Sequence, residues 1–289
     1  MTDDTVYEHI NEAKADLHHI YNEPDPRAYF RELRKLGYTI PGAAKPIFRR
    51  LIDVLRRRQD DPVRVLDIGC SYGVNAALLK HDLSMDELYD HWGQKRFTDA
   101  SPDEVAEYDR QYFASLDGGE DIEVIGLDQA ENAIAFAEEA GLLDDGLAVD
   151  LETAPLPDGA RDDLTPVDLV TSTGCVGYVT DKTFDRLLPA VTSGRPSWLA
   201  NFVLRMFPFE DITRTLDARG YVTEKLDGRT FVQRRFVSTD EQNQVLARLR
   251  ERGVDPTGKE AAGHLHAEFY LSRPRQDAAD LPLGQLLTA

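Results

Sequence analysis

A short stretch in the first third of the chain has the residue types needed to hold a small ligand. An apolar run, 63–66, ends at Asp67, and three small residues follow at alternate positions, Gly69, Ser71 and Gly73. Glycine adopts backbone conformations that a side chain forbids, and it lets the main chain approach a ligand closely at the end of a strand. A dinucleotide site carries G-x-G-x-x-G, whereas here an aspartate precedes G-x-x-x-G. Because Asp67 places negative charge beside this turn, we expect a cationic or zwitterionic ligand.

Other polar groups follow three later strand-like segments. Asp128 and Asp150 end two of them, and Thr173 begins the loop, 173–178, that follows a third. In an open α/β sheet, ligands bind outside the carboxyl ends of the strands, so these groups are expected to converge on the turn at 69–73. An acid at the end of the second strand suits the hydroxyl groups of a ribose. The pattern therefore predicts a nucleoside-binding site.

Several other chemistries lack the residues that they need. Cys70 and Cys175 form no C-x-x-C pair, and both are expected to be small buried side chains near the pocket. His264 and His266 fall on the same side of a strand, but a metal site needs more ligands, and H-E-x-x-H is absent. The G-x-S-x-G motif of hydrolases is also absent. We therefore expect no metal and no covalent nucleophile.

Strand and helix alternate from residue 63 to 220, which predicts a mostly parallel sheet with helices on both faces. The predicted strands are 63–67, 122–128, 147–152, 167–172, 197–204, 221–226, 230–237 and 267–272. The predicted helices of this part are 74–80, 132–140, 184–192, 209–219 and 240–252. Asp227-Gly228 predicts a hairpin turn between two strands, so an antiparallel edge is expected.

The chain is expected to consist of a core with two helical additions. Residues 1–60 show helical periodicity without strand alternation and form an N-terminal cap, with helices predicted at 4–20, 27–36 and 43–58 and a turn at 38–42. The core, 61–275, is interrupted at 81–121 by a segment too long for an ordinary loop. We interpret this segment as an inserted lid of two short helices, one of them capped by Ser101. The tail, 276–289, is expected to be loosely ordered.

Composition limits the partners. The chain has 289 residues and a formal net charge of −19, which disfavours nucleic acid and anionic membranes. It has no apolar run long enough to span a membrane and no basic-then-apolar leader, so a cytoplasmic protein is expected.

With these motifs the sequence resembles the family of Rossmann-like (class I) S-adenosylmethionine-dependent methyltransferases. Residues 65–73 resemble the first motif, acid-x-Gly-x-Gly-x-Gly, with Ser71 in place of the middle glycine. Residues 125–128 resemble the second motif, 149–152 the third and 167–173 the fourth, all in the family's order. The resemblance covers about 63–237 and implies a seven-stranded, mostly parallel Rossmann-like sheet.

The resemblance also implies roles for individual residues. The turn at Gly69 would hold the methionine part, and Asp67 would face its ammonium through the loop or water. Asp128 would bind the ribose hydroxyls, and Asp150 with the backbone of Leu151 would bind adenine. The implied cofactor-binding set is Asp67, Gly69, Cys70, Ser71, Gly73, Asp128, Gln129, Asp150, Leu151 and Thr173.

The reaction itself is less constrained than the cofactor. The Asn/Asp-Pro-Pro-Tyr motif of nucleic-acid and amide methylases is missing after 167–172, so we expect a small-molecule acceptor, in specialised metabolism. Tyr178 is the candidate catalytic residue, and Tyr38, Tyr112 and Tyr178 are candidate substrate contacts. The alternative is a lyase of the azetidine-2-carboxylate synthase type, which closes the aminobutyryl chain and releases methylthioadenosine. Helical arms in this family either cover the pocket or pair subunits, so a homodimer stays open.

Overall fold

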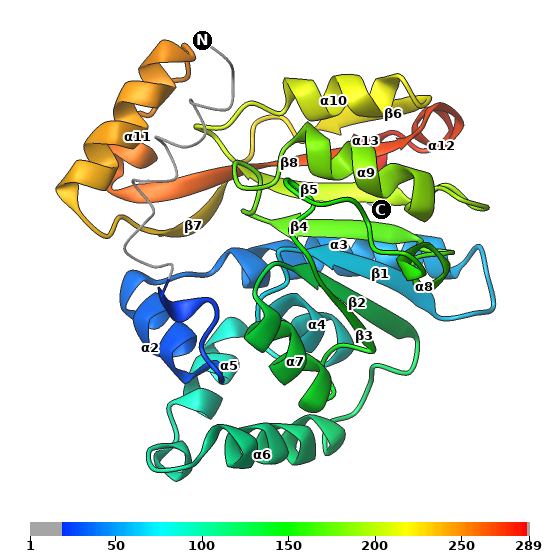
Figure 1. Ribbon diagram of the computed structural model, residues 1–289. Helices are drawn as coiled ribbons and strands as arrows, with labels where there is room; N and C mark the ends of the chain where they lie inside the picture. The colour runs from blue at the N-terminus through cyan, green and yellow to red at the C-terminus, as the bar shows by residue number, and fades with distance from the viewer. Residues whose placement is uncertain (1–18, 288–289) are drawn as a thin grey trace.

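The computed structural model describes residues 19–287, and an eight-stranded sheet runs through its centre (Figure 1). The strands are β1 (Val63–Ile68), β2 (Ile122–Asp128), β3 (Asp145–Ala148), β4 (Leu169–Thr173), β5 (Trp198–Leu204), β6 (Tyr221–Lys225), β7 (Phe231–Arg235) and β8 (His264–Pro274). Their order is β3-β2-β1-β4-β5-β8-β6, and β7 also pairs with β8. The first five strands in this order are parallel, and β8 is antiparallel to β5. The predicted Rossmann-like sheet with an antiparallel edge is confirmed, with one strand more than seven.

Helices cover both faces of the sheet. Figure 1 shows α3 and α4 on one side and α9 and α10 on the other. The α-helices of the core are α4 (Val74–Lys80), α7 (Glu131–Glu139), α8 (Ala160–Asp163), α9 (Asp181–Val191), α10 (Glu210–Asp217) and α11 (Thr239–Glu251), and a short 3-10 helix, η3 (Glu260–Ala262), precedes β8. The core is apolar and aromatic where α3 crosses the sheet, since the ring of Phe48 meets that of Phe202 at 5.4 Å. Phe202 in turn contacts Phe231 and Phe269, which joins β5, β7 and β8.

The cap and the insertion are helical, as predicted. The cap contributes α2 (Arg27–Leu36) and α3 (Ile40–Arg56), and the insertion contributes α5 (Met85–Trp92), η2 (Lys95–Phe97) and α6 (Pro102–Ala114). The predicted helix at 4–20 lies almost wholly outside the described residues. The capping box of α6 is confirmed, because the Ser101 amide donates to Glu104 at 2.8 Å and the Glu104 amide donates to Ser101 Oγ at 3.3 Å. The turn expected at 38–42 is wrong in part: α3 already begins at Ile40, since Pro41 is tolerated in a first helical turn.

The predicted hairpin at Asp227-Gly228 is wrong. β6 pairs with residues 270–274 of β8, and β7 pairs with residues 264–267 of the same strand. Both are antiparallel to β8, so they run in the same direction, one after the other, along it. β8 has eleven residues, five more than predicted, and this length lets one strand take two partners.

Two boundaries also differ from the sequence prediction. β3 ends at Ala148, so Asp150 lies in the turn beyond it and not in the strand. The side chain of Asp150 accepts a hydrogen bond from the Glu152 amide at 2.9 Å, and such a side-chain turn replaces the strand ladder. The tail is more ordered than expected: α12 (Arg275–Asp280) and α13 (Leu283–Leu286) form there, and α13 buries Leu283 and Leu286 against the core.

Candidate functional site

The turn after β1 has the backbone that its glycines suggested. Gly69 and Gly73 adopt φ of 70° and 73°, and Ser71 adopts φ of 49°, which is uncommon for a residue with a side chain. A Cβ at Gly69 would lie 2.7 Å from the Cβ of Cys175, so the loop after β4 crosses directly over the turn. Only glycine allows this approach.

Asp128, at the end of β2, holds this turn in place. One carboxylate oxygen accepts the amide of Ser71 at 2.9 Å, and the other accepts the amide of Ala130 at 3.0 Å. Burial raises the pKa of Asp128 above its ordinary value, while these backbone donors oppose the rise. The carboxylate therefore lies at the rim of the turn, and Asp128 lines the cavity described below.

Asp67 lies underneath the turn and not in the cavity. It is fully buried, and it accepts hydrogen bonds from Thr171 Oγ1 at 2.7 Å and from Asn75 Nδ2 at 3.0 and 3.1 Å. Asn75 also donates to Thr173 Oγ1 at 3.1 Å. Burial raises the pKa of Asp67 to about 7. The sequence prediction that Asp67 acts on a ligand ammonium through the loop or water stays a prediction, and the hydrogen bonds of Asn75 link Asp67 to Thr173 at the cavity wall.

The loop after β3 is clamped to the start of α9. The Glu152 carboxylate accepts the amide of Thr180 at 2.8 Å, its hydroxyl at 2.7 Å and the hydroxyl of Thr183 at 2.5 Å. Arg186 adds hydrogen bonds to the carbonyl oxygens of Leu151 and Ala154 at 2.5 and 2.9 Å. These contacts fix Asp150 and Leu151, which are the residues expected at an adenine ring, relative to the loop that carries Tyr178.

One cavity of about 400 Å³ lies at the carboxyl ends of β1, β2, β3 and β4. Nine residues predicted for the site line it, namely Tyr38, Gly69, Ser71, Asp128, Gln129, Asp150, Leu151, Thr173 and Tyr178. Four others do not, namely Asp67, Cys70, Gly73 and Tyr112. Cys70 is buried beneath the turn, Gly73 begins α4, and Tyr112 stacks on His91 inside the insertion at 4.0 Å. The cavity thus brings the turn and the strand-end acids together.

Further residues that line the cavity come from parts of the chain without a recognisable sequence motif. Tyr21 and Tyr29 of the cap line it, and so do Gln233 and Arg234 of β7. Arg234 is buried and forms two hydrogen bonds with Glu241, at 2.6 and 3.0 Å. Nothing in the sequence marked Gln233, Arg234 or Asn75 as residues of the site.

The cap is fastened over the cavity from two sides. The hydroxyl of Tyr72, within the turn, donates to the carbonyl oxygens of Ile20 and Glu23 at 3.2 and 2.9 Å. The Asn22 side chain accepts a hydrogen bond from the backbone amide of Asn132 at 2.9 Å. The backbone carbonyl of Asn22 accepts a second one from the Asn132 side chain, also at 2.9 Å. Tyr21 lies between these anchors and forms part of the cavity wall.

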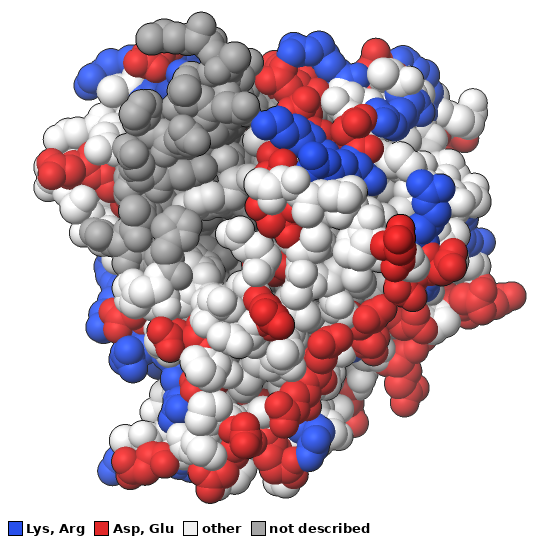
Figure 2. All heavy atoms as spheres, viewed as in Figure 1, with Lys and Arg blue, Asp and Glu red and all other residues white. Residues whose placement is uncertain are grey.

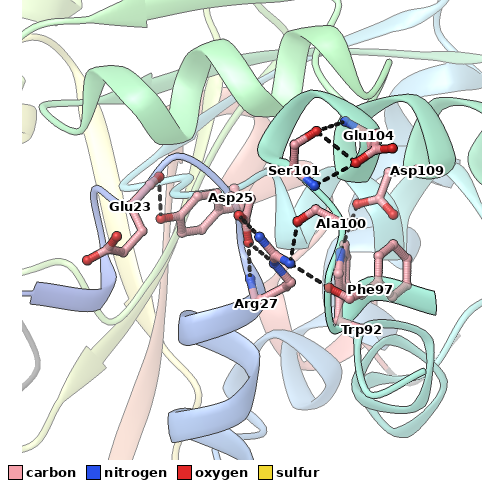
Figure 3. A network of polar contacts seen from close by, with 10 residues as sticks. Glu23, Asp25, Arg27, Trp92, Phe97, Ala100, Ser101, Glu104 and Asp109 are labelled. Atoms are coloured by element: carbon pink, nitrogen blue, oxygen red, sulfur yellow. Dashed lines mark hydrogen bonds and ion pairs between the residues drawn. The ribbon is translucent and has the colours of Figure 1, made fainter. Parts of the chain in front are cut away.

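The cap is also joined to the insertion (Figure 3). Arg27 forms an ion pair with Asp25 at 2.7 Å and donates to the carbonyl oxygens of Phe97 and Ala100 at 2.5 and 2.9 Å. Phe30 of α2 stacks on Trp92 of α5 at 3.9 Å. Cap and insertion therefore pack as one unit beside the cavity.

Within residues 19–287, no group of three or more histidine, cysteine or acidic side chains has a geometry that could hold a metal ion. Over the same residues, no helix is both long and apolar enough to cross a membrane.

Comparison of the fold with solved structures gives matches at low identity. The plantazolicin methyltransferase BpumL in complex with SAH is 12% identical, with 94% of this chain and 99% of that chain covered and a TM-score of 0.45. The [4+2]-cyclase SpnF is 16% identical, covering 78% and 80%, with a TM-score of 0.36. The magnesium protoporphyrin IX methyltransferase ChlM from Synechocystis PCC 6803 with bound SAM is 13% identical, covering 77% and 76%, with a TM-score of 0.37. No protein-family model and no curated protein sequence matches the chain.

Proposed function

We propose that this protein is an S-adenosylmethionine-dependent methyltransferase acting on a small molecule. The observation that carries the proposal is the convergence in one cavity of the glycine turn, Asp128 at the end of β2 and the Asp150–Leu151 turn beyond β3. These three groups suit the methionine, ribose and adenine parts of the ligand, in that order along the sheet edge.

A local feature of the turn supports the fit. Ser71 Oγ is buried and has no hydrogen-bond partner among residues 19–287, although Ser71 lines the cavity. A buried hydroxyl without a partner is costly, and a polar ligand group beside the turn would remove that cost. The residues present therefore fit a ligand with a polar tail at this point.

The chain's own residues do the positioning. Asp128 binds the ribose hydroxyls, and the Leu151 backbone with Asp150 binds the adenine edge. The bound cofactor supplies a methyl group on a sulfonium. Tyr21 and Tyr178 exclude water from the far end of the cavity, where an acceptor must approach, because in-line displacement depends mainly on alignment and desolvation.

The test is calorimetric binding of S-adenosylhomocysteine to the wild type and to Asp128→Ala. We expect at least tenfold weaker binding for the variant, since a carboxylate that accepts two ribose hydroxyls is lost. Glu139→Ala, which removes an exposed carboxylate outside the cavity lining, is the control and should bind normally. Unchanged affinity in Asp128→Ala would show that the ribose is placed wrongly.

The second candidate is the cyclase considered from the sequence. A tyrosine-walled cavity over the cofactor also suits closure of the aminobutyryl chain, which needs no external acceptor. Incubation of the pure protein with S-adenosylmethionine alone separates the two. Catalytic release of methylthioadenosine would reject the methyltransferase, whereas S-adenosylhomocysteine formed only with an added acceptor would reject the cyclase.

A further inference from the structure

The far end of the cavity is walled by tyrosines. Tyr21, Tyr29 and Tyr38 come from the cap, and Tyr178 comes from the loop after β4. The ring of Tyr29 meets that of Tyr21 at 5.6 Å and 79°, and that of Tyr38 at 6.3 Å and 82°. These cap rings pack edge to face, and together with Tyr178 they form the aromatic lining that we call the tyrosine box. Such boxes attract cations through the negative faces of the rings.

No group among the described residues that line the cavity is free to remove a proton from an acceptor. Glu152 is occupied by three donors from Thr180 and Thr183, and the Cys175 thiol donates to the carbonyl of Ile68 at 3.3 Å. Burial raises the pKa values of Tyr21, Tyr38 and Tyr178, so these phenols keep their protons near neutral pH. Asp128 accepts the amides of Ser71 and Ala130, and Asp150 accepts the Glu152 amide at 2.9 Å and the Thr153 hydroxyl at 2.8 Å. The acceptor must therefore be an atom that attacks the methyl group without first giving a proton to the protein.

The charge around the cavity is negative. Three acids in its lining, Asp128, Asp150 and Glu152, face a single described cation, Arg234, which is itself paired with the buried Glu241. The segment 131–163, of which residues 149–152 line the cavity, contains ten acidic residues and one basic residue, Arg161. Figure 2 shows acidic side chains gathered over the region of α7 and β3. This field concentrates cations at the mouth and repels carboxylates and phosphates.

We propose that the acceptor is an amine, and that the tyrosine box holds its nitrogen; this inference rests on the proposed methyltransferase function. The ammonium form is drawn to the acidic mouth and loses its proton to solvent as it is buried, because burial disfavours the charged form of an amine. The nitrogen lone pair then forms the N–CH₃ bond while the S–CH₃ bond breaks and sulfur keeps the electron pair. The nitrogen becomes positive, and the ring faces stabilise it until it leaves or gives a proton to water. A phenol or a carbon acid would need the base that the lining lacks.

The test uses two probes of equal shape that differ in charge. Protein saturated with S-adenosylhomocysteine is titrated in a calorimeter with choline and, separately, with 3,3-dimethylbutan-1-ol, in which carbon replaces the nitrogen. We expect choline to bind at least tenfold more tightly. Equal or weaker binding of choline, including no binding of either probe, would overturn the proposal. Because both titrations start from the protein–S-adenosylhomocysteine complex, such a result leaves the proposed function standing, whereas failure to form that complex rejects the function first.

Two variants of one tyrosine locate the effect. Tyr178→Phe keeps the ring and should bind choline within about threefold of the wild type, whereas Tyr178→Leu should lose about tenfold. Tyr270→Leu on β8, outside the cavity lining, is the matched control. Retained S-adenosylhomocysteine binding shows that each variant is folded. Choline binding that is unchanged in Tyr178→Leu would exclude this ring from the box.

Discussion

Glu152 is predicted to be the residue that holds the two ligand-binding loops together, and Glu152→Ala tests it. The substitution removes an ionised acceptor from three donors, the Thr180 amide, the Thr180 hydroxyl and the Thr183 hydroxyl, the last of which is buried. A hydrogen bond to a charged group contributes about 1.5–3 kcal/mol, but Glu152 is half-buried and water can replace part of the loss. We therefore expect the free energy of unfolding to fall by about 2–4 kcal/mol. For a chain of this length, that lowers the melting temperature by roughly 3–7 °C.

The same substitution should also weaken ligand binding, because Glu152 follows Leu151 directly. Differential scanning calorimetry gives the stability, and titration with S-adenosylhomocysteine gives the affinity, which we expect to fall by about tenfold. Glu139→Ala is the control, since it removes the same charge from an exposed position at the end of α7. If the two variants melt within about 1 °C of each other, the clamp does not stabilise the protein and the reasoning is refuted.

Two more predictions concern the turn after β1. Gly69→Ala should lower the free energy of unfolding by about 2 kcal/mol or more beyond the effect of Gly37→Ala. Both positions have positive φ, but only at Gly69 does the new Cβ meet Cys175, at 2.7 Å. Equal urea midpoints for the two variants would argue against the close crossing of the two loops. Asp67 should make the protein less stable as pH rises. Its pKa is about 7 in the folded state and about 3.9 in an unfolded chain, so its contribution is complete below about pH 4 and is lost as pH rises through about 7. Urea unfolding at pH 5 and pH 8 should show a smaller difference for Asp67→Asn than for the wild type, and an unchanged difference would contradict the raised pKa.

Much of the site could be predicted because its signals are local. Gly69, Gly73 and Asp128 each follow a buried strand directly, and the carboxyl ends of parallel strands meet at one edge of the sheet. For a residue that directly follows such a strand, its position in the chain therefore predicts its place at this edge. The same logic does not decide whether Asp67 lines the cavity, because a side chain near the end of a strand can point under the following loop as easily as into the cavity. Burial and the bonds from Asn75 and Thr171 decide this, and a single sequence does not show them.

The remaining features depend on pairing over long distances in the chain. Arg234 reaches the cavity only because β7 continues along β8 after β6, an arrangement that the turn-forming pair Asp227-Gly228 does not reveal. Tyr112 lies on a helix, as Tyr29 does, but its ring packs inside the insertion against His91. Aromatic residues on an amphipathic helix can serve the core or a cavity, and only the packing partner distinguishes these uses.

The Arg27 junction has a consequence for how this protein can be recombined with others. Its partners, Phe97 and Ala100, lie 70 residues or more along the chain, in the insertion, while Tyr72 fastens the cap to the turn. Cap and insertion therefore form one exchangeable module, although they are two separate stretches of chain. A chimera that takes the insertion from another protein should fold well only if residues 20–36 come with it.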